Sequence, residues 1–142
     1  MQRTELVVAA LAASGARKAF TPVQVQKLFF LLDREAPHLF SGPHFDFQPY
    51  DYGPFDRAVY IELDNLSATG MVQIENSGRV RRYCLTNGGM KLGEDVLLTM
   101  SNASRDYLQK LSEWIAALSF QQLVSAVYLR HPDMKVNSVF QE

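Results

Sequence analysis

The sequence predicts a mainly helical α+β protein, and three features of the 142 residues support this. Apolar residues recur at helical spacing through most of the chain. Two short segments on either side of Asn76-Ser77-Gly78 have the pattern of a β-hairpin. Residues 45–55 hold five aromatics, two prolines and a glycine directly before an amphipathic helix. Such a density of rigid residues indicates one fixed corner of the chain.

The first two helices are expected in residues 2–14 and 22–35. Gly15 should end the first, because glycine readily adopts the left-handed conformation found after helix ends. The second should begin with a capping box formed by Thr21 and Gln24, with a proline at its first position. Its apolar arc is wide, which is typical of a central helix rather than a surface one.

The corner is expected to follow a short strand at residues 45–48, where polar and apolar residues alternate. A third helix should begin at Pro54 and run to about Thr69, with Gly70 capping its end. Residues 71–75 and 79–85 then form the predicted hairpin.

Three more helices are expected after the hairpin. Thr86 could cap the first, which should reach about Met100, and the second spans about 104–118. Ser119 and Gln122 form another capping box, opening the last helix, which should end near Arg130. Residues 133–142 are expected to be an extended tail.

The predicted order of helix, helix, short strand, helix and hairpin is that of a winged helix, with the hairpin as the wing. We therefore expect one domain, 1–142. Residues 1–100 would be a winged-helix-like core, and residues 101–142 a C-terminal helical extension and tail.

Composition gives a net charge of -1, which provides no whole-chain attraction to nucleic acid or to an anionic membrane. The single cysteine, Cys84, excludes an intramolecular disulfide and fits a reducing compartment. The apolar run 6–13 does not resemble a signal peptide, and no apolar run approaches the roughly 20 residues that span a bilayer. We expect a cytoplasmic protein that does not contact membranes.

Three segments and the end of the chain resemble a known bacterial family. The segments are VQKLFFLL at 25–32, YDYGPFDRAVY at 50–60 and YCLTNGG at 83–89, and the closing residues are 126–138. They resemble the YwgA-like proteins and the SocA-like (Panacea-domain) antitoxins, in which a leucine-glutamine-lysine-leucine helix precedes a tyrosine-glycine-proline corner. Phe55 follows the glycine-proline pair where the Panacea pattern has valine, which places the chain closer to the YwgA-like branch.

The resemblance implies a small helical, winged-helix-like protein without a known cofactor. Members of the family are linked to toxin–antitoxin pairs and to phage defence. They bind a partner protein and either block it or deliver it for degradation. The partner expected from the resemblance is a toxin or a defence component.

The corner aromatics are the candidate partner-binding residues. Their rings could line a groove for a peptide or a flat ligand, since tyrosine offers a large contact area at low entropic cost. The alternative is a structural latch, in which the prolines and Gly53 fix the backbone and the rings pack on the second helix. The four residues are Tyr50, Tyr52, Phe55 and Tyr60.

The hairpin carries the candidate nucleic-acid-binding residues, Arg79, Arg81 and Arg82, which could contact phosphate or a minor groove. The helix expected to enter a major groove carries Asp56, Glu62 and Asp64, and this acidic face disfavours sequence-specific reading. A simpler interpretation is that the three arginines are solvated charges.

No catalytic residue, metal site or cofactor is predicted. His38 and His44 lie near Asp46 and Asp51, but their spacing matches no zinc signature, and Cys84 is expected to be buried in a strand. One further apolar stripe should pack in the core, although surplus surface there could serve a homodimer or a partner. Its members are Leu108, Leu111, Ile115 and Leu118, with Trp114 beside them.

The function expected from the sequence is a non-enzymatic protein-interaction module. It would hold its partner through the corner, with the hairpin and the C-terminal helices as further contact surfaces. The alternative is a winged-helix DNA-binding transcriptional regulator that contacts phosphates through the hairpin arginines.

Overall fold

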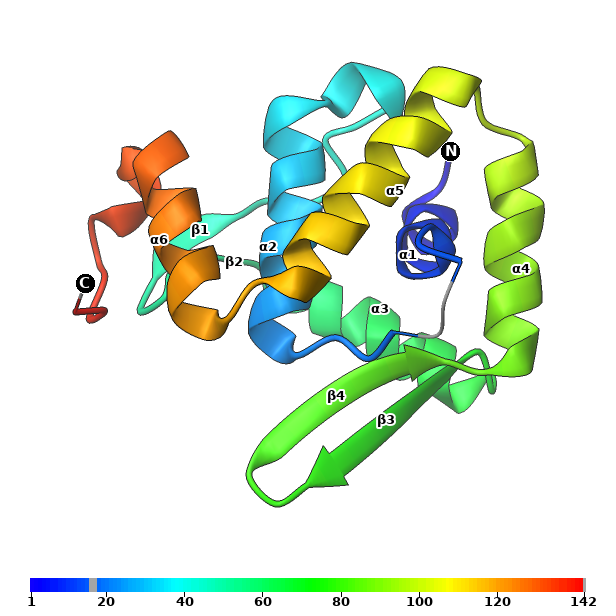
Figure 1. The fold of residues 1–142 in the computed structure, drawn as a ribbon, viewed down its shortest axis with the longest axis horizontal. Helices are drawn as coiled ribbons and strands as arrows, with labels where there is room; N and C mark the ends of the chain where they lie inside the picture. Colours follow the sequence, from blue (N-terminus) through cyan, green and yellow to red (C-terminus); the bar gives the residue numbers. More distant parts are fainter. Residues whose placement is uncertain (16–17, 142) are drawn as a thin grey trace.

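The structure is a computed structural model that describes residues 1–15 and 18–141. Within these residues it confirms a mainly helical α+β protein with two small antiparallel hairpins (Figure 1). The α-helices are α1 (Arg3–Ala12), α2 (Pro22–Glu35), α3 (Arg57–Ala68), α4 (Asn87–Leu98), α5 (Asn102–Ala117) and α6 (Phe120–Arg130). The hairpins are β1 (Gln48–Tyr50) with β2 (Gly53–Phe55), and β3 (Val72–Ser77) with β4 (Val80–Leu85). Short 3-10 helices cover Pro37–Leu39 (η1) and Pro132–Lys135 (η2).

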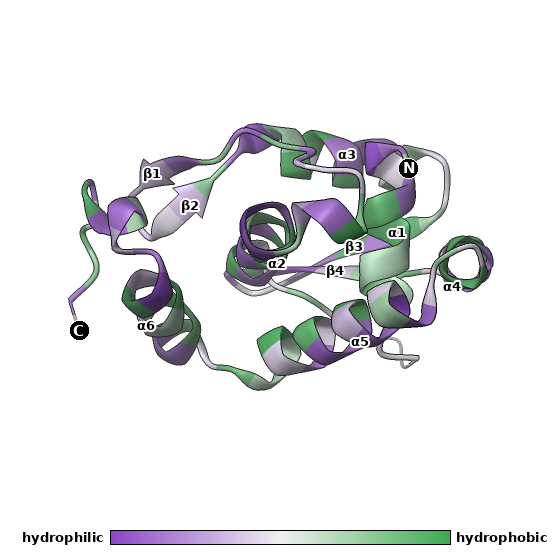
Figure 2. Cartoon of the chain, turned by 90° about the horizontal axis from the view of Figure 1, so that it is seen from above, coloured by the Kyte–Doolittle hydropathy of each residue, from purple (hydrophilic) through white to green (hydrophobic). Residues whose placement is uncertain are grey.

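Helix α2 lies at the centre of the molecule, as its wide apolar arc predicted. Every residue from Val25 to Asp33 is buried, including three polar side chains. Figure 2 shows α2 nearly end-on between α3 and α5, with α6 and the β1–β2 hairpin beyond it on the opposite side from α4. The capping box of Thr21 and Gln24 is present at its start.

Helix α4 packs closely on α1. A Cβ atom placed on Gly93 would lie 2.6 Å from both the Cβ of Ala12 and the carbonyl oxygen of Val8. No side chain fits there without a shift, because contacts below 3 Å involve overlap. Gly93 therefore sets the distance between the two helices.

The β3–β4 hairpin is confirmed, with its turn at Gly78, whose φ is +61°. A third segment joins it. Phe20 N donates to Tyr83 O at 2.9 Å, and Tyr83 N donates to Phe20 O at 2.8 Å. Phe20, two residues before α2, thus pairs with β4 and ties the hairpin to the core.

The corner differs from the prediction. The strand expected at 45–48 was wrong in position, because β1 begins at Gln48 and pairs with β2 across Pro49 and Pro54. The helix start at Pro54 was also wrong. Pro54 lies in β2, and Asp56 caps α3 by accepting a hydrogen bond from Ala58 N at 2.8 Å. Asp56 suits the cap, since its carboxylate satisfies an amide that the helix leaves unpaired.

The C-terminal segment folds back instead of extending. After α6 and η2, Val139 N donates to Asp51 O at 2.9 Å, and Asn137 Nδ2 donates to Pro49 O at 3.1 Å. The Tyr128 hydroxyl donates to Ser138 Oγ at 2.6 Å. These bonds hold residues 137–139 against the β1–β2 hairpin.

Of the helices in the described residues, none is long and apolar enough to span a bilayer.

Candidate functional site

The four corner aromatics predicted from the sequence lie around one cavity of about 230 Å³. The cavity lies between the first half of α2 and the β1–β2 hairpin, and Tyr60 of α3 closes one side. The lining residues are Val23, Gln26, Lys27, Tyr50, Asp51, Tyr52, Gly53, Phe55 and Tyr60. The sequence prediction thus identified four of the residues that meet here.

The aromatic rings form a continuous layer along the cavity. Tyr50 stacks on Phe55 with ring centroids 5.0 Å apart, and Phe55 meets the edge of Tyr60 at 5.6 Å. Tyr60 in turn stacks on the buried Tyr83 of β4 at 6.3 Å. The half-buried rings of Phe55 and Tyr60 therefore hold the exposed ring of Tyr50 in place, because offset and edge contacts between aromatic rings are favourable.

An exposed apolar surface surrounds the mouth of the cavity. Tyr50 is 56% exposed and Tyr52 is 44% exposed. The ring of Tyr52 contacts Phe120 of α6 at 5.2 Å, and Phe120 is itself 44% exposed. Val139 of the returning C-terminal segment is 57% exposed. We call Tyr50, Tyr52, Phe120 and Val139 the corner surface.

Lys27 forms the floor of the cavity and is only 3% exposed. Its Nζ donates to Pro54 O at a long 3.4 Å. Burial lowers the pKa of Lys27 to about 7, because an ammonium ion is poorly stabilised away from water. Gly53 passes directly over this side chain. A Cβ there would lie 3.6 Å from Nζ, and the φ of Gly53 is +102°.

Two other polar residues of α2 hold distant loops of the chain, and one of them, Gln26, also lines the cavity. Gln26 Nε2 donates to Asp56 O, and its Oε1 accepts from Asp56 N, both at 2.9 Å. The Asp33 carboxylate accepts from His44 N at 2.9 Å and from Phe45 N at 2.8 Å. Burial raises the pKa of Asp33, and these two bonds oppose that rise. Both side chains act as structural clamps.

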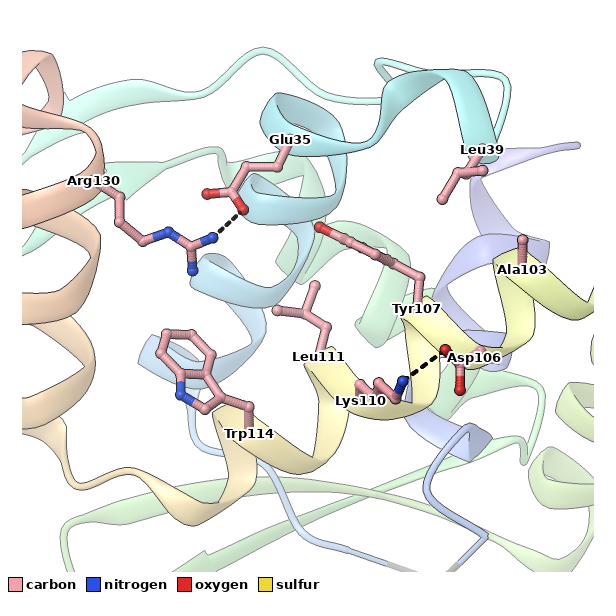
Figure 3. A pocket seen from close by; sticks show the side chains of 9 residues that line it. All are labelled: Glu35, Leu39, Ala103, Asp106, Tyr107, Lys110, Leu111, Trp114 and Arg130. Carbon is pink, nitrogen blue, oxygen red and sulfur yellow. Dashed lines mark hydrogen bonds and ion pairs between the residues drawn. The ribbon is translucent and has the colours of Figure 1, made fainter.

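A second, larger hollow of about 620 Å³ lies between α2, α5 and α6 (Figure 3). Its charged groups are paired. Arg130 contacts Glu35 at 2.7 Å, and Lys110 contacts Asp106 at 2.9 Å. Glu35 also meets His131 Nε2 at 2.7 Å. The charges are balanced within the hollow, which therefore has no evident preference for an anion or a cation.

The stripe on α5 divides between the core and this hollow. Leu108, Leu111 and Ile115 are buried, and Leu118 is half-buried. Trp114 and Tyr107 turn toward the hollow, as Figure 3 shows. Burial raises the pKa of Tyr107, and the nearby Glu35 adds to the rise.

The hairpin arginines lie apart from both hollows. Arg79 and Arg81 are exposed and Arg82 is half-buried. A hydrogen bond to Tyr83 is the main cause that raises the pKa of Arg81, and Asp64 of α3 contributes. Arg81 is thus partly engaged within the protein.

The residues considered for catalysis do not assemble a metal site. Within residues 1–15 and 18–141, no group of three or more His, Cys, Asp or Glu side chains could hold a metal ion. His44 Nε2 bonds Phe40 O at 2.6 Å, and His38 is exposed on η1. Cys84 is half-buried in β4, with Sγ 3.5 Å from Leu85 O.

Sequence reasoning missed Lys27 and Gln26 as parts of the site. The available signal was their position, since two polar residues interrupt the apolar arc of α2. Such residues must be hydrogen-bonded or open to a cavity, because burying an unpaired polar group is costly. Comparison of the chain with models of protein families, with curated proteins and with solved structures found no match.

Proposed function

We propose that this protein is a non-enzymatic interaction module that binds a partner protein through the corner surface. The observation that carries the proposal is the exposure of Tyr50 and Tyr52 around the mouth of a cavity. Large exposed aromatics beside a pocket are typical of binding hot spots, whereas scattered single apolar residues are ordinary surface.

The rigidity of the corner supports this proposal. Gln26 clamps Asp56 at one end of the hairpin, and the bond from Val139 N to Asp51 O fixes the turn. Tyr50 is further held by its stack on Phe55. A partner that binds here would order few side chains, so little conformational entropy opposes association.

The class of partner follows from the fold and the resemblance. The pairing of Phe20 with β4 adds a third strand-like segment between α1 and α2, which supports a winged-helix-like arrangement of α1, α2, α3 and the hairpin. The resemblance to YwgA-like and SocA-like proteins favours a toxin or a phage-defence component as the partner, in the cytoplasm.

Photo-crosslinking tests the proposal. A photoreactive benzoylphenylalanine in place of Tyr52, in cells that naturally encode the chain, should trap the partner for identification. The Tyr50→Ala/Tyr52→Ala variant should then bind the purified partner at least about tenfold more weakly. Leu98→Ala is the matched control, because Leu98 is 74% exposed on α4, a helix that lies far from the β1–β2 hairpin in Figure 1.

The opposite outcome would assign the corner a structural role. If the tyrosine variant binds the partner as tightly as Leu98→Ala does, and only its melting temperature falls, the rings are a latch and the proposal is wrong. A crosslink to a second copy of the same chain would identify the corner surface as a homodimer interface.

DNA binding is the second candidate, and the hairpin favours it. The hairpin projects from the body of the molecule (Figure 1), with Arg79 and Arg81 exposed. It would contact phosphates rather than bases, because α3 exposes the acidic Asp64. Salt-dependent retention of duplex DNA, lost in an Arg79/Arg81/Arg82 triple alanine variant, would favour this candidate over the corner surface.

A further inference from the structure

The ammonium group of Lys27 makes fewer hydrogen bonds than its N–H groups allow. It has three N–H groups, and among the described residues it donates one hydrogen bond, the long one to Pro54 O. The other two clamps of α2, Gln26 and Asp33, each make two hydrogen bonds of 2.9 Å or less. A buried charge without a close partner is costly, and replacing it by an apolar residue would ordinarily stabilise the fold.

The cavity offers Lys27 a place for a partner that is not part of the chain. Its volume of about 230 Å³ lies below the range usual for drug-sized ligands, so it suits a single amino-acid residue or a fragment of that size. Phe55 and Tyr60 supply apolar walls, and Lys27 is the one cation in the described lining.

The charge of the lining favours a monoanion over a doubly charged ligand. Asp51 stands at the rim and is exposed, so a doubly charged phosphate would be repelled on entry. A carboxylate attached to an apolar body meets both requirements. Its oxygens would accept from Lys27 Nζ, and its body would pack on the aromatic walls.

The surroundings of the mouth favour a polypeptide over a small metabolite. Tyr50, Tyr52 and Phe120 extend the apolar surface beyond the cavity. Asp51 O in the hairpin turn accepts from Val139 N and Ser138 Oγ, so the backbone beside the cavity already holds a non-helical segment of the chain. The residues preceding a bound terminus would therefore have surface to contact.

We propose that the cavity above Lys27 binds the C-terminal carboxylate of the partner protein, with an aromatic or branched apolar last residue seated against Phe55 and Tyr60. This inference rests on the proposed function, because it names the part of the partner that the corner surface recognises.

The proposal implies that binding weakens as pH rises. A carboxylate pairs with the protonated lysine, and the pKa of Lys27 in the protein is about 7. Above pH 7, binding of a carboxylate requires Lys27 to take up one proton. The affinity should therefore fall by about tenfold per pH unit, until the pH reaches the raised pKa that Lys27 has in the complex.

The other groups facing the cavity are Tyr50, Asp51, Tyr52 and Tyr60, and Tyr128 lies across Gly53. Burial raises the pKa of Tyr60, which keeps its phenol protonated in this range.

Peptide binding tests the proposal directly. The probes are a Gly/Ser hexapeptide that ends in Phe with a free C-terminus, the same peptide amidated, and N-acetylphenylalanine, each measured by calorimetry with the full chain at pH 6.5. The free terminus should bind at least about tenfold more tightly than the amide. Lys27→Met should lose this preference, while Lys91→Met, a change at an exposed lysine of α4, should keep it.

A measurement on the unaltered protein covers the case in which Lys27→Met folds poorly. The NMR signal of the Lys27 side chain should titrate near pH 7, and the free-terminus peptide should move this titration upward by about one unit or more. The amidated peptide should leave it unchanged.

The outcomes separate this proposal from the proposed function. If free and amidated peptides bind alike, or if neither binds at millimolar concentration, carboxylate recognition is wrong, whatever the tyrosine variants do to the partner. If N-acetylphenylalanine binds as tightly as the peptide, the ligand is a free small carboxylate and the assignment to a partner terminus is overturned. If the peptides bind as predicted but the partner binds the Tyr50→Ala/Tyr52→Ala variant as tightly as the wild-type protein, carboxylate recognition stands. Only the partner-binding function of the corner surface is then wrong.

Discussion

At the scale of single residues, the three buried polar side chains of α2 have unequal roles. Gln26 and Asp33 each satisfy two backbone groups of distant loops, so their burial is offset by hydrogen bonds. Lys27 has one long bond and faces a cavity. Because of this inequality, we propose a binding role for Lys27 and structural roles for Gln26 and Asp33.

The first prediction concerns the pH dependence that Lys27 imposes on stability. Its pKa falls from 10.5 to about 7 on folding, so the unfolded chain binds more protons between these values and the free energy of unfolding rises with pH across that range. From pH 7 to pH 9 the gain should be about 2 kcal/mol, because Lys27 has already lost about half of its charge in the folded protein at pH 7. Urea denaturation of the wild-type protein at the two pH values measures it.

Two lysine variants isolate this effect from the other titrating groups. Lys27→Met should be more stable than the wild-type protein at pH 7, because the methionine carries no charge to desolvate. For the same reason its free energy of unfolding should not show the rise between pH 7 and pH 9. Lys91→Met should keep the wild-type gain, since Lys91 is exposed. Equal gains in all three proteins would show that Lys27 does not hold a depressed pKa.

The sequence predicts such residues only in part. Lys27 and Gln26 are visible as polar interruptions of an apolar arc, but Gln26 is paired with Asp56, 30 positions away. The position of Tyr52 depends likewise on Phe120, which its ring contacts although Phe120 is far along the chain. Residue type indicated a cluster of aromatics, and only the fold determines which rings face solvent.

At the scale of elements, the predictions that rest on local capping are confirmed. Thr21 and Ser119 both form their capping boxes, and Thr86 accepts a hydrogen bond from Gly89 N. These signals lie within four residues, so the sequence alone contains them. The helix start at Pro54 was wrong because a distant residue, Gln26, holds the backbone of Asp56 beyond the short β2 strand.

The second prediction concerns the contact between α1 and α4. Gly93→Ala should destabilise the protein by about 2 kcal/mol, since the new methyl group would overlap Val8 O and Ala12 Cβ at 2.6 Å and the helices must separate. The gain in helix propensity, about 1 kcal/mol, offsets only part of this cost. Chemical denaturation measures the difference.

Gly88→Ala is the matched control within the same helix. The nearest atom to its new Cβ would be the end of the flexible Met71 side chain at 3.3 Å, which can move. This variant should have wild-type stability or slightly more. If the two variants behave alike, close packing at Gly93 does not determine the position of α4.

At the scale of the whole molecule, segments from the two halves of the sequence build one corner. The hairpin comes from residues 48–55, and residues 137–139 bond to it from the other end of the chain. Arg34 of α2 also contacts Asp133 at 3.0 Å, and Arg130 contacts Glu35. The cavity and its exposed rim therefore depend on the chain having folded completely, which is why the sequence could indicate the aromatics without indicating a pocket.

The last prediction concerns this closure. A chain that ends after Lys135 lacks the bonds from Asn137 and Val139 to the hairpin, each worth about 1 kcal/mol. The amides of the β1–β2 hairpin should then exchange with solvent at least about tenfold faster, while those of α2 should keep their protection, because local opening depends on local contacts. Hydrogen exchange read by NMR distinguishes the two regions.

A chain ending after Phe140 is the control, since it keeps both bonds and should match the wild-type protein. Equal loss of protection in α2 would show instead that the C-terminal segment stabilises the whole fold, and unchanged exchange in the hairpin would show that the corner is rigid without it.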